Sequence, residues 1–222
     1  MAYSFSPSTL ALLNECPRCF WLHFKKGIRR PLGIFPSLPS GMDSVIKCHF
    51  DSFRARNMLP PELSSLRGVN LFQDLELLKK WRNNLRGVSW VDAEGNRFRG
   101  AVDELLEKGG KLIVLDFKTR GFPLKQGTEL LYKDQLDIYN LLLRKNGYQT
   151  EDYAYLLFYH PLEVDEHGSV VFHTDLIRVE VSVSNAEKIF ARALEVLQGE
   201  MPEPAEDCDY CRWAEKLANL DT

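Results

Sequence analysis

The sequence lacks the features that mark a membrane protein, a secreted protein or a molecular motor. No run of about 18 apolar residues occurs along the chain, which argues against a transmembrane helix. The N-terminus does not join a basic start to an apolar stretch, so no secretory signal peptide is expected. The glycine-rich phosphate loop of ATP-driven motors is also missing. These absences predict a cytoplasmic protein with no membrane partner, in which any motor function belongs to another protein.

An excess of basic charge is missing as well. The 28 Lys and Arg residues stand against 31 Asp and Glu, so the net charge is −3 and any site for a polyanion must be a local patch. Hydrophobic residues make up 45% and charged residues 27%, as in ordinary globular proteins. The five cysteines are not expected to form structural disulfides in the cytosol. The length is enough for one domain or for one domain with an appended lobe. We predict a single domain over 1–222, with a strand-rich core at 86–181 and cysteine-bearing ends at 1–30 and 200–222.

Gly109 and Gly110 separate two apolar runs and predict a β-hairpin with a two-residue turn. With this turn, Asp103 falls directly opposite Asp116, and their Cβ atoms should lie about 4.5–5.5 Å apart on one face. Lys118 shares this face because side chains alternate along a strand. The sequence therefore predicts two carboxylates and an ammonium group in one patch.

Two carboxylates placed opposite each other require a cation, because like charges at this distance are destabilising and buried carboxylates otherwise lose their charge. Mg²⁺ is commonly held by one or two carboxylates together with phosphate oxygens and water. Lys118 could then orient a water molecule or offset developing negative charge. The alternative is a solvated Asp-x-Lys ion pair at a strand end. The second aspartate in register and the apolar strand around Ile113 favour the metal site.

The remaining pattern predicts helices before and after a cluster of strands. The expected helices begin at Ser6 and cover 43–56, 72–81, 128–145 and 184–197; the expected strands cover 88–91, 98–106, 112–118, 153–159 and 170–181, with a loop at 29–40. The first three strands are expected to form a meander. This order predicts an α/β (α+β) fold with a central mixed sheet flanked by helices.

Gln135 and Tyr139 are four residues apart and therefore share one face of the expected helix over 128–145. From the spacing alone, the two residues could belong to a functional site, or Tyr139 could belong to the core and Gln135 to the surface.

Two Cys-x-x-Cys pairs lie near opposite ends of the chain, at Cys16 and Cys19 and at Cys208 and Cys211. Together they supply four thiolates, the complement for tetrahedral Zn²⁺ or a [4Fe–4S] cluster. The alternatives are four unrelated thiols or a redox pair. Cys48 is expected to be a buried thiol in an apolar helix.

Three motifs in series resemble those of the PD-(D/E)XK nuclease superfamily. They are GAVD at 100–103, DFKT at 116–119 and QLDIY at 135–139. Each motif is weak alone, but their order and spacing make the series specific. It is most similar to the RecB-like branch, which includes the iron–sulfur exonucleases of CRISPR adaptation, and the resemblance extends from Ser4 to Trp213.

The resemblance implies a restriction-endonuclease-like core and a Mg²⁺- or Mn²⁺-dependent nuclease. The metal would be held by Asp103, Asp116 and the backbone carbonyl of Phe117. The implied catalytic residues are Asp103, Asp116, Lys118, Gln135 and Tyr139. The implied reaction is phosphodiester hydrolysis by an exonuclease acting on single-stranded DNA or DNA ends, with a helicase or a CRISPR-adaptation protein as partner. The alternatives are a catalytically silent nucleic-acid-binding or accessory module, which the intact motif residues disfavour, and a metal-stapled interaction protein.

Basic residues near the hairpin are candidates for phosphate contacts, although they could equally form an ordinary solvated face. They are Arg97, Arg99, Lys111, Arg120 and Lys125.

The resemblance also bears on the cysteines and on one histidine. Iron–sulfur relatives combine one N-terminal cysteine with three near the C-terminus, and Cys16, Cys208 and Cys211 match three of these positions. No cysteine follows Cys211, and Cys19 stands where relatives usually carry a basic residue. We therefore expect a [4Fe–4S] cluster with Cys19 as substitute fourth ligand, and Zn²⁺ as the alternative. The relatives place a metal-binding histidine on an early helix; His49 is a candidate at a longer spacing than usual, and Glu62 and Glu76 are weaker candidates.

Overall fold

The computed structural model describes residues 2–220, which divide into two compact units. The first, here called the sheet unit, comprises Phe35–Trp90 and Arg99–Val183. The second, here called the terminal unit, comprises the described parts of Met1–Ile34, Val91–Phe98 and Ser184–Thr222. Within residues 2–220, no helix is both long enough and apolar enough to cross a membrane.

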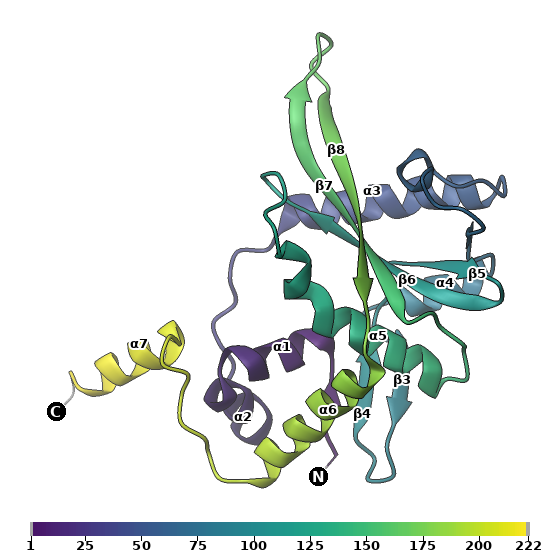
Figure 1. The fold of residues 1–222 in the computed structure, drawn as a ribbon. Helices are drawn as coiled ribbons and strands as arrows, with labels where there is room; N and C mark the ends of the chain where they lie inside the picture. Colours follow the sequence, from purple (N-terminus) through teal and green to yellow (C-terminus); the bar gives the residue numbers. More distant parts are fainter. Residues whose placement is uncertain (1, 221–222) are drawn as a thin grey trace. The chain divides into compact units, whose positions relative to one another are not determined.

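The sheet unit is built on a five-stranded mixed sheet with the order β2-β5-β6-β7-β8 (Figure 1). Its strands are β2 (Asn70–Leu71), β5 (Glu104–Lys108), β6 (Lys111–Thr119), β7 (Tyr153–Val164) and β8 (Val170–Glu180). β6 and β7 are parallel, and the other neighbours are antiparallel. The predicted fold class, a mixed sheet flanked by helices, is confirmed.

Helices cover both faces of the central strand β6. Phe50 of α3 (Ser37–Arg54) packs on Phe117, with ring centroids 4.8 Å apart. Gln135 of α5 (Lys133–Lys145) reaches the neighbouring residue Asp116. Because consecutive residues of a strand point to opposite faces, α3 and α5 lie on opposite sides of β6. The strand is therefore buried on both sides, and residues 112–117 are all buried.

The predicted Gly-Gly hairpin is confirmed. Gly109 and Gly110 have φ values of 57° and 82°, a region that favours glycine and suits a type I′ turn, and Lys108 pairs with Lys111. β3 (Val88–Val91) also has the predicted bounds.

The predicted strand over 98–106 is wrong, because the chain turns in its middle. β4 (Arg97–Gly100) ends there and lies between β1 (Ser4–Phe5) and β3 in a three-stranded sheet. This sheet is separate from the one that contains β5 and β6, so the predicted meander is also wrong. A Cβ atom on Gly100 would lie 2.7 Å from Cε1 of Tyr139, so only glycine lets the backbone approach this ring. Two residues later, the amide of Val102 donates to the carbonyl of Trp81 and not to a neighbouring strand.

Several helix bounds also differ from the predictions. α3 begins at Ser37, inside the predicted loop over 29–40, because Pro39 falls within the first turn, where its missing N–H is tolerated. α4 (Leu75–Trp81) begins later than predicted, where the Asp74 side chain accepts from the amide of Leu77 at 2.9 Å. The expected helix over 128–145 starts as a 3₁₀ helix (Thr128–Tyr132), and a further 3₁₀ turn covers Pro61–Leu63. Cys48, predicted to be buried, is exposed.

The terminal unit contains α1 (Pro7–Glu15), α2 (Pro17–Lys26), most of α6 (Val183–Gln198) and α7 (Asp209–Ala218). Neither α2 nor α7 was predicted from the sequence. Ser6 caps α1 as predicted, with its hydroxyl accepting from the amide of Thr9 at 3.3 Å. Stacked aromatic rings form the core of this unit: Phe98 lies 5.1 Å from Phe190, and Phe5 lies 6.2 Å from Phe20.

Candidate active site and four-cysteine centre

Asp103 immediately precedes β5, at the end of the hairpin where β6 extends further than its partner strand. The five pairs from Glu104–Leu115 to Lys108–Lys111 have the predicted register, which puts Asp103 one step beyond the last pair, opposite Asp116. Its carboxylate oxygen Oδ2 accepts a hydrogen bond from the amide of Phe117 at 3.1 Å. The Asp103 side chain thus bonds the β6 amide that lies beyond the end of the β5 ladder.

Asp116 is almost completely buried, with 1% of its surface exposed. Its Oδ1 accepts from Nε2 of Gln135 at 3.2 Å, and its Oδ2 forms an ion pair with the Lys118 ammonium. Burial raises the pKa of Asp116 to about 7; Lys118 opposes this shift, and the charge and hydrogen bonding of Asp103 add to it. The site therefore holds a carboxyl group that ionises near neutral pH and requires positive charge beside it.

Gln135 joins the predicted residues into one network. Its Oε1 accepts from Nζ of Lys118 at 3.1 Å, while its Nε2 donates to Asp116 and to the phenol oxygen of Tyr139 at 2.7 Å. Burial, followed by the charges of Asp116 and Asp103, raises the pKa of Tyr139 well above its usual value, so the phenol stays protonated. Gln135 and Tyr139 share a helix face, as their spacing predicted, and both face the aspartates.

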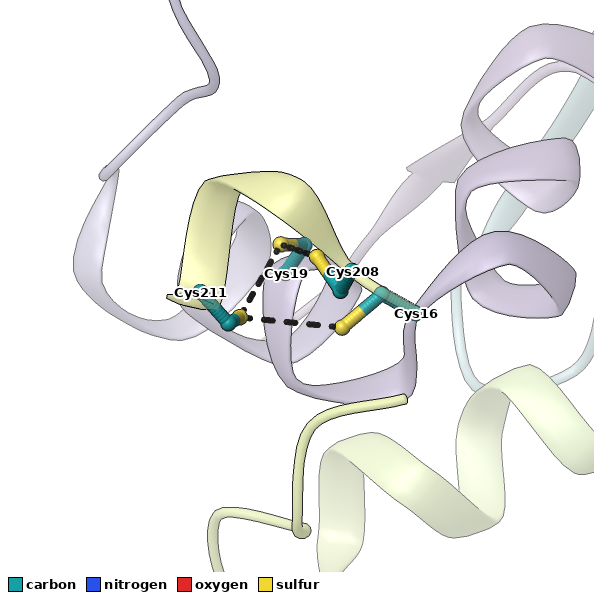
Figure 2. Close-up of side chains that lie close together, drawn as sticks. All are labelled: Cys16, Cys19, Cys208 and Cys211. Atoms are coloured by element: carbon teal, nitrogen blue, oxygen red, sulfur yellow. Dashed lines mark hydrogen bonds between the residues drawn. The ribbon is translucent and has the colours of Figure 1, made fainter. Parts of the chain in front are cut away.

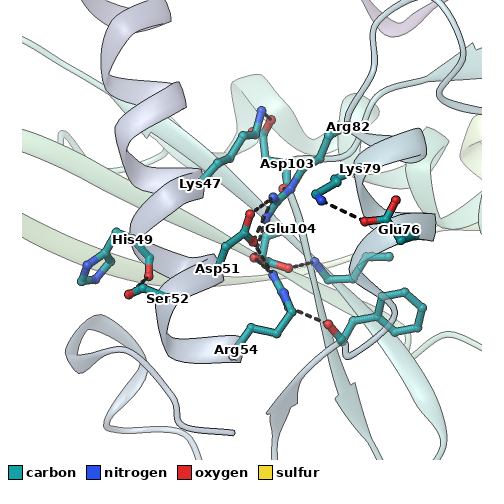
Figure 3. Close-up of polar contacts among 12 residues, drawn as sticks. Lys47, His49, Asp51, Ser52, Arg54, Glu76, Lys79, Arg82, Asp103 and Glu104 are labelled. Atoms are coloured by element: carbon teal, nitrogen blue, oxygen red, sulfur yellow. Dashed lines mark hydrogen bonds and ion pairs between the residues drawn. The ribbon is translucent and has the colours of Figure 1, made fainter. Parts of the chain in front are cut away.

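Sequence reasoning missed Lys47 of α3, which lies against Asp103 (Figure 3). Its Nζ is 2.9 Å from Oδ1 of Asp103 and 2.8 Å from Oδ2 of Asp43. Burial lowers the pKa of Lys47, but the two carboxylates outweigh this effect, so the net shift is upward. The Asp43–Lys47 spacing of four residues is a visible helical ion-pair signal, but it does not indicate contact with Asp103.

Arg82 and Arg54 were also missed, and they hold the start of β5 in place (Figure 3). Arg82 donates from Nε to the backbone carbonyl of Asp103 at 2.8 Å and pairs with the fully buried Glu104 at 3.0 Å. Arg54 pairs with the same Glu104 oxygen at 2.5 Å. Burial raises the pKa of Glu104, and both guanidinium groups oppose that shift. This buried ion cluster fixes the backbone from which the Asp103 side chain projects.

The other acid and histidine candidates have different partners. Nε2 of His49 lies 3.2 Å from the carboxylate of Glu62, which also accepts from the phenol of Tyr159 at 3.2 Å. Figure 3 shows His49 directed away from Asp103. Glu76 is exposed and pairs with Lys79 at 2.9 Å. Among the contacts found within residues 2–220, none links His49, Glu62 or Glu76 to either aspartate.

The basic candidates are dispersed. Lys111 lies at the far end of β6, about 16 Å along the strand from Asp116, and its nearest acidic partner is Glu151 at 3.9 Å. Arg99 donates to the backbone carbonyl of Asn84. Arg97 belongs to the terminal unit. Of the set, only Arg120 and Lys125 lie in the segment that follows β6, the strand that carries Lys118.

The oxygen atoms at the end of β5 suit a divalent cation. The amide of Arg120 donates to Tyr159 of β7, so by alternation the backbone of Phe117 faces the opposite side, toward β5. Since β5 starts only at Glu104, the Phe117 carbonyl points to the edge where the Asp103 carboxylate lies. Oδ2 of Asp116 is buried and faces Lys118 without a hydrogen bond of normal geometry. Two carboxylates and a carbonyl form the oxygen donor set that Mg²⁺ or Mn²⁺ prefers.

The four cysteines of the terminal unit converge into one buried cluster (Figure 2). Their ligand atoms all lie within 4.8 Å of one another. Cys16 immediately precedes α2 and Cys208 immediately precedes α7, so each Cys-x-x-Cys spans the start of a helix. The predicted grouping of both pairs around one point is confirmed, and the cluster can bind a metal.

Hydrogen-bond donors surround the cysteine sulfurs. The amide of Ala205 donates to Sγ of Cys16 at 3.5 Å, and Nη2 of Arg30 donates to Sγ of Cys208 at 3.6 Å. Burial raises the pKa of Cys16, but hydrogen bonds, led by that from Ala205, outweigh it and lower the value to about 7. Burial raises the pKa values of Cys19 and Cys211.

Comparison with protein-family models identifies the superfamily of this chain. Residues 55–215 match the model of the PD-(D/E)XK nuclease superfamily. The matched region includes Asp103, Asp116, Lys118 and Gln135, and its C-terminal part includes Cys208 and Cys211. Comparison with curated proteins gives no match.

Proposed function

The chain belongs to the PD-(D/E)XK nuclease superfamily, and from this premise we propose that it is a metal-dependent deoxyribonuclease whose active site is formed by Asp103, Asp116 and Lys118. The observation that supports this most strongly is the hydrogen-bonded network at the start of β5, in which the residues of all three sequence motifs meet. A module that only binds nucleic acid does not need a buried carboxyl group paired with an ammonium group.

In this proposal Asp103, Asp116 and the backbone carbonyl of Phe117 hold one or two Mg²⁺ or Mn²⁺ ions. The bound metal supplies Lewis-acid chemistry to the scissile phosphate and lowers the pKa of water. Arg82 keeps the Asp103 backbone in place, and Lys47 holds its carboxylate in an ion pair. Hydrolysis adds water across one P–O bond and leaves one phosphomonoester end and one hydroxyl end.

Lys118 supplies a positive charge in addition to that of the metal ion. Its ammonium is held by Asp116 and Gln135 and lies 4.5 Å from the centre of the Tyr132 ring. A charge that is positioned before the reaction stabilises the extra negative charge of the transition state without reorganisation. The protonated phenol of Tyr139 bonds Gln135 and so positions the amide that orients Lys118.

The substrate and the biological context rest on the motif series. We propose exonuclease action on single-stranded DNA or DNA ends, and a helicase–nuclease or CRISPR-adaptation complex as the setting, because the three motifs most resemble the RecB-like branch. Arg120 and Lys125, which follow Lys118, are the basic residues best placed in the sequence to contact flanking phosphates.

The test is a cleavage assay on anaerobically purified protein with end-labelled single- and double-stranded DNA and Mg²⁺ or Mn²⁺. Wild type should cleave, whereas Asp116→Ala and Lys118→Met should lose at least a factor of about 100, the usual scale for a residue that stabilises the transition state. Lys79→Met, which alters an exposed lysine on α4, is the matched control and should retain activity. Absence of cleavage by folded wild-type protein on any DNA would favour the accessory-module alternative.

A further inference from the structure

We infer that the four-cysteine centre holds a single tetrahedral Zn²⁺ ion and not the [4Fe–4S] cluster that the family resemblance implies. The inference concerns the terminal unit alone and does not depend on the proposed nuclease activity. It rests on the distances between the sulfurs, on the position of Cys19 and on the way α7 is anchored.

The sulfur atoms are spaced for one ion. Sγ of Cys19 lies 3.6 Å from that of Cys208 and 3.7 Å from that of Cys211, and Sγ of Cys16 lies 3.8 Å from that of Cys211. In a tetrahedral site with Zn–S bonds of about 2.3 Å, neighbouring sulfurs are about 3.8 Å apart. The centre of such a tetrahedron is one Zn–S bond length from each thiolate.

A [4Fe–4S] cluster needs a wider arrangement. In a cubane each thiolate binds a different iron, and four iron and four sulfide atoms lie between the thiolates. Here all four ligand atoms lie within 4.8 Å of one another, which leaves room for one atom at the centre but none for an eight-atom cluster. The spacing therefore disagrees with the expected cluster and agrees with a mononuclear site.

The ligand pattern leads to the same result. Cys19 is buried and takes part in two of the three shortest sulfur–sulfur contacts, so it is a full member of the set. Each Cys-x-x-Cys contributes one thiolate before a helix and one in its first turn. Two such pairs form the symmetrical donor set of structural zinc sites. The amide of Ala205 and the guanidinium of Arg30 donate to sulfur and offset the negative charge of four thiolates around one divalent ion.

The ion has a structural task in this unit. Cys211 is the only buried residue of α7, and the cluster around the sulfurs adds only the partly buried Leu12 and Ala205. The apolar side chains of α7, among them Trp213 and Leu217, are exposed, so burial of an apolar face does not fix this helix to the unit. Binding of Zn²⁺ by both pairs would tie α7 to α2, and removal of the ion should release the C-terminal segment.

Metal analysis of the wild-type protein tests the inference. The chain is purified without oxygen from cells grown with ample iron, and zinc, iron and acid-labile sulfide are measured per chain. We expect one zinc, no iron, no sulfide and no visible absorbance. Stoichiometric iron with sulfide and a brown charge-transfer spectrum would overturn the inference, and so would protein that contains no metal and takes up no added Zn²⁺.

Variants and proteolysis provide independent readouts. Cys19→Ser should lose most of the zinc, whereas Cys48→Ser, which alters the exposed thiol outside the cluster, should retain it. Chelation of zinc should make the segment before α7 sensitive to limited proteolysis, and Zn²⁺ but not Mg²⁺ should restore protection. Resistance to proteolysis in fully zinc-free protein would refute the structural role. If Cys19→Ser fails to fold, the metal content of wild type still decides, and Asp116→Asn should retain its zinc whatever its nuclease activity.

Discussion

The buried carboxyl group of Asp116 yields a prediction about stability that needs no knowledge of the substrate. In Mg²⁺-free buffer at pH 8, Asp116→Asn should have a higher free energy of unfolding than wild type, although the substitution removes a proposed catalytic group. The reason is that burial raises the pKa of Asp116 from 3.8 to about 7, so an ionised Asp116 costs more free energy in the folded state than in the unfolded state. Asparagine resembles the protonated carboxyl group in shape and carries no charge.

The magnitude and the sign follow from the shift. Each pKa unit corresponds to about 1.4 kcal/mol, so a shift of about three units corresponds to about 4 kcal/mol. Because the folded pKa is the higher one, this contribution to stability is fully present below pH 3.8 and is lost as the pH rises to about 7. The advantage of the variant should therefore be a few kcal/mol at pH 8 and clearly smaller at pH 5.

Urea unfolding of both proteins at pH 5 and pH 8, followed by far-UV circular dichroism, measures this difference. Asp209→Asn, which alters an exposed aspartate on α7, serves as control and should change the stability by less than about 0.5 kcal/mol. An Asp116→Asn protein that is less stable than wild type at pH 8, or equally stable at both pH values, would refute the reasoning. The first result would mean that the ion pair with Lys118 outweighs the cost of burial.

Three further predictions concern the same region. Mg²⁺ at 100 times its Kd should raise the free energy of unfolding of wild type by about 2.7 kcal/mol, and Asp103→Asn should weaken this effect, as measured by urea titration with and without the ion. Gly100→Ala should cost about 1–3 kcal/mol and reduce cleavage, because the new methyl group would lie 2.7 Å from the Tyr139 ring. Arg54→Met should cost about 3 kcal/mol, because the buried Glu104 would lose one of its two guanidinium partners.

Matched variants exist for the last two predictions. Gly121→Ala has open space around its new methyl group and should be nearly neutral, and Arg56→Met alters an exposed arginine two residues beyond Arg54. Equal effects of Gly100→Ala and Gly121→Ala would show that the close approach of Tyr139 has no energetic consequence. A Mg²⁺ response that survives Asp103→Asn unchanged would place the ion elsewhere.

Local periodicity was enough to predict the centre of this site. The Gly109-Gly110 turn sets the pairing of β5 with β6, and a side-chain period of two then places Asp103, Asp116 and Lys118 together. The helical spacing of Gln135 and Tyr139 put both on one helix face, and the tertiary structure directs this face toward Asp116. These predictions succeed because each depends on one turn or one helix, whose geometry its own residues largely determine.

The contacts of Lys47 and Arg82 with Asp103 were invisible in the sequence, because their residues are distant along the chain and no period connects them. The break of the predicted strand at Gly100 has the same origin, since it depends on the ring of Tyr139 from a later helix.

The cysteines show most clearly which features the sequence determines and which depend on the tertiary structure. The two Cys-x-x-Cys pairs by themselves determined that four thiolates are available for a metal, because the short spacing within each pair keeps its two thiols close together. Only the tertiary structure decided how far apart the pairs lie. That distance depends on how α2 and α7 pack, and it distinguishes a site for one ion from a site for a cluster.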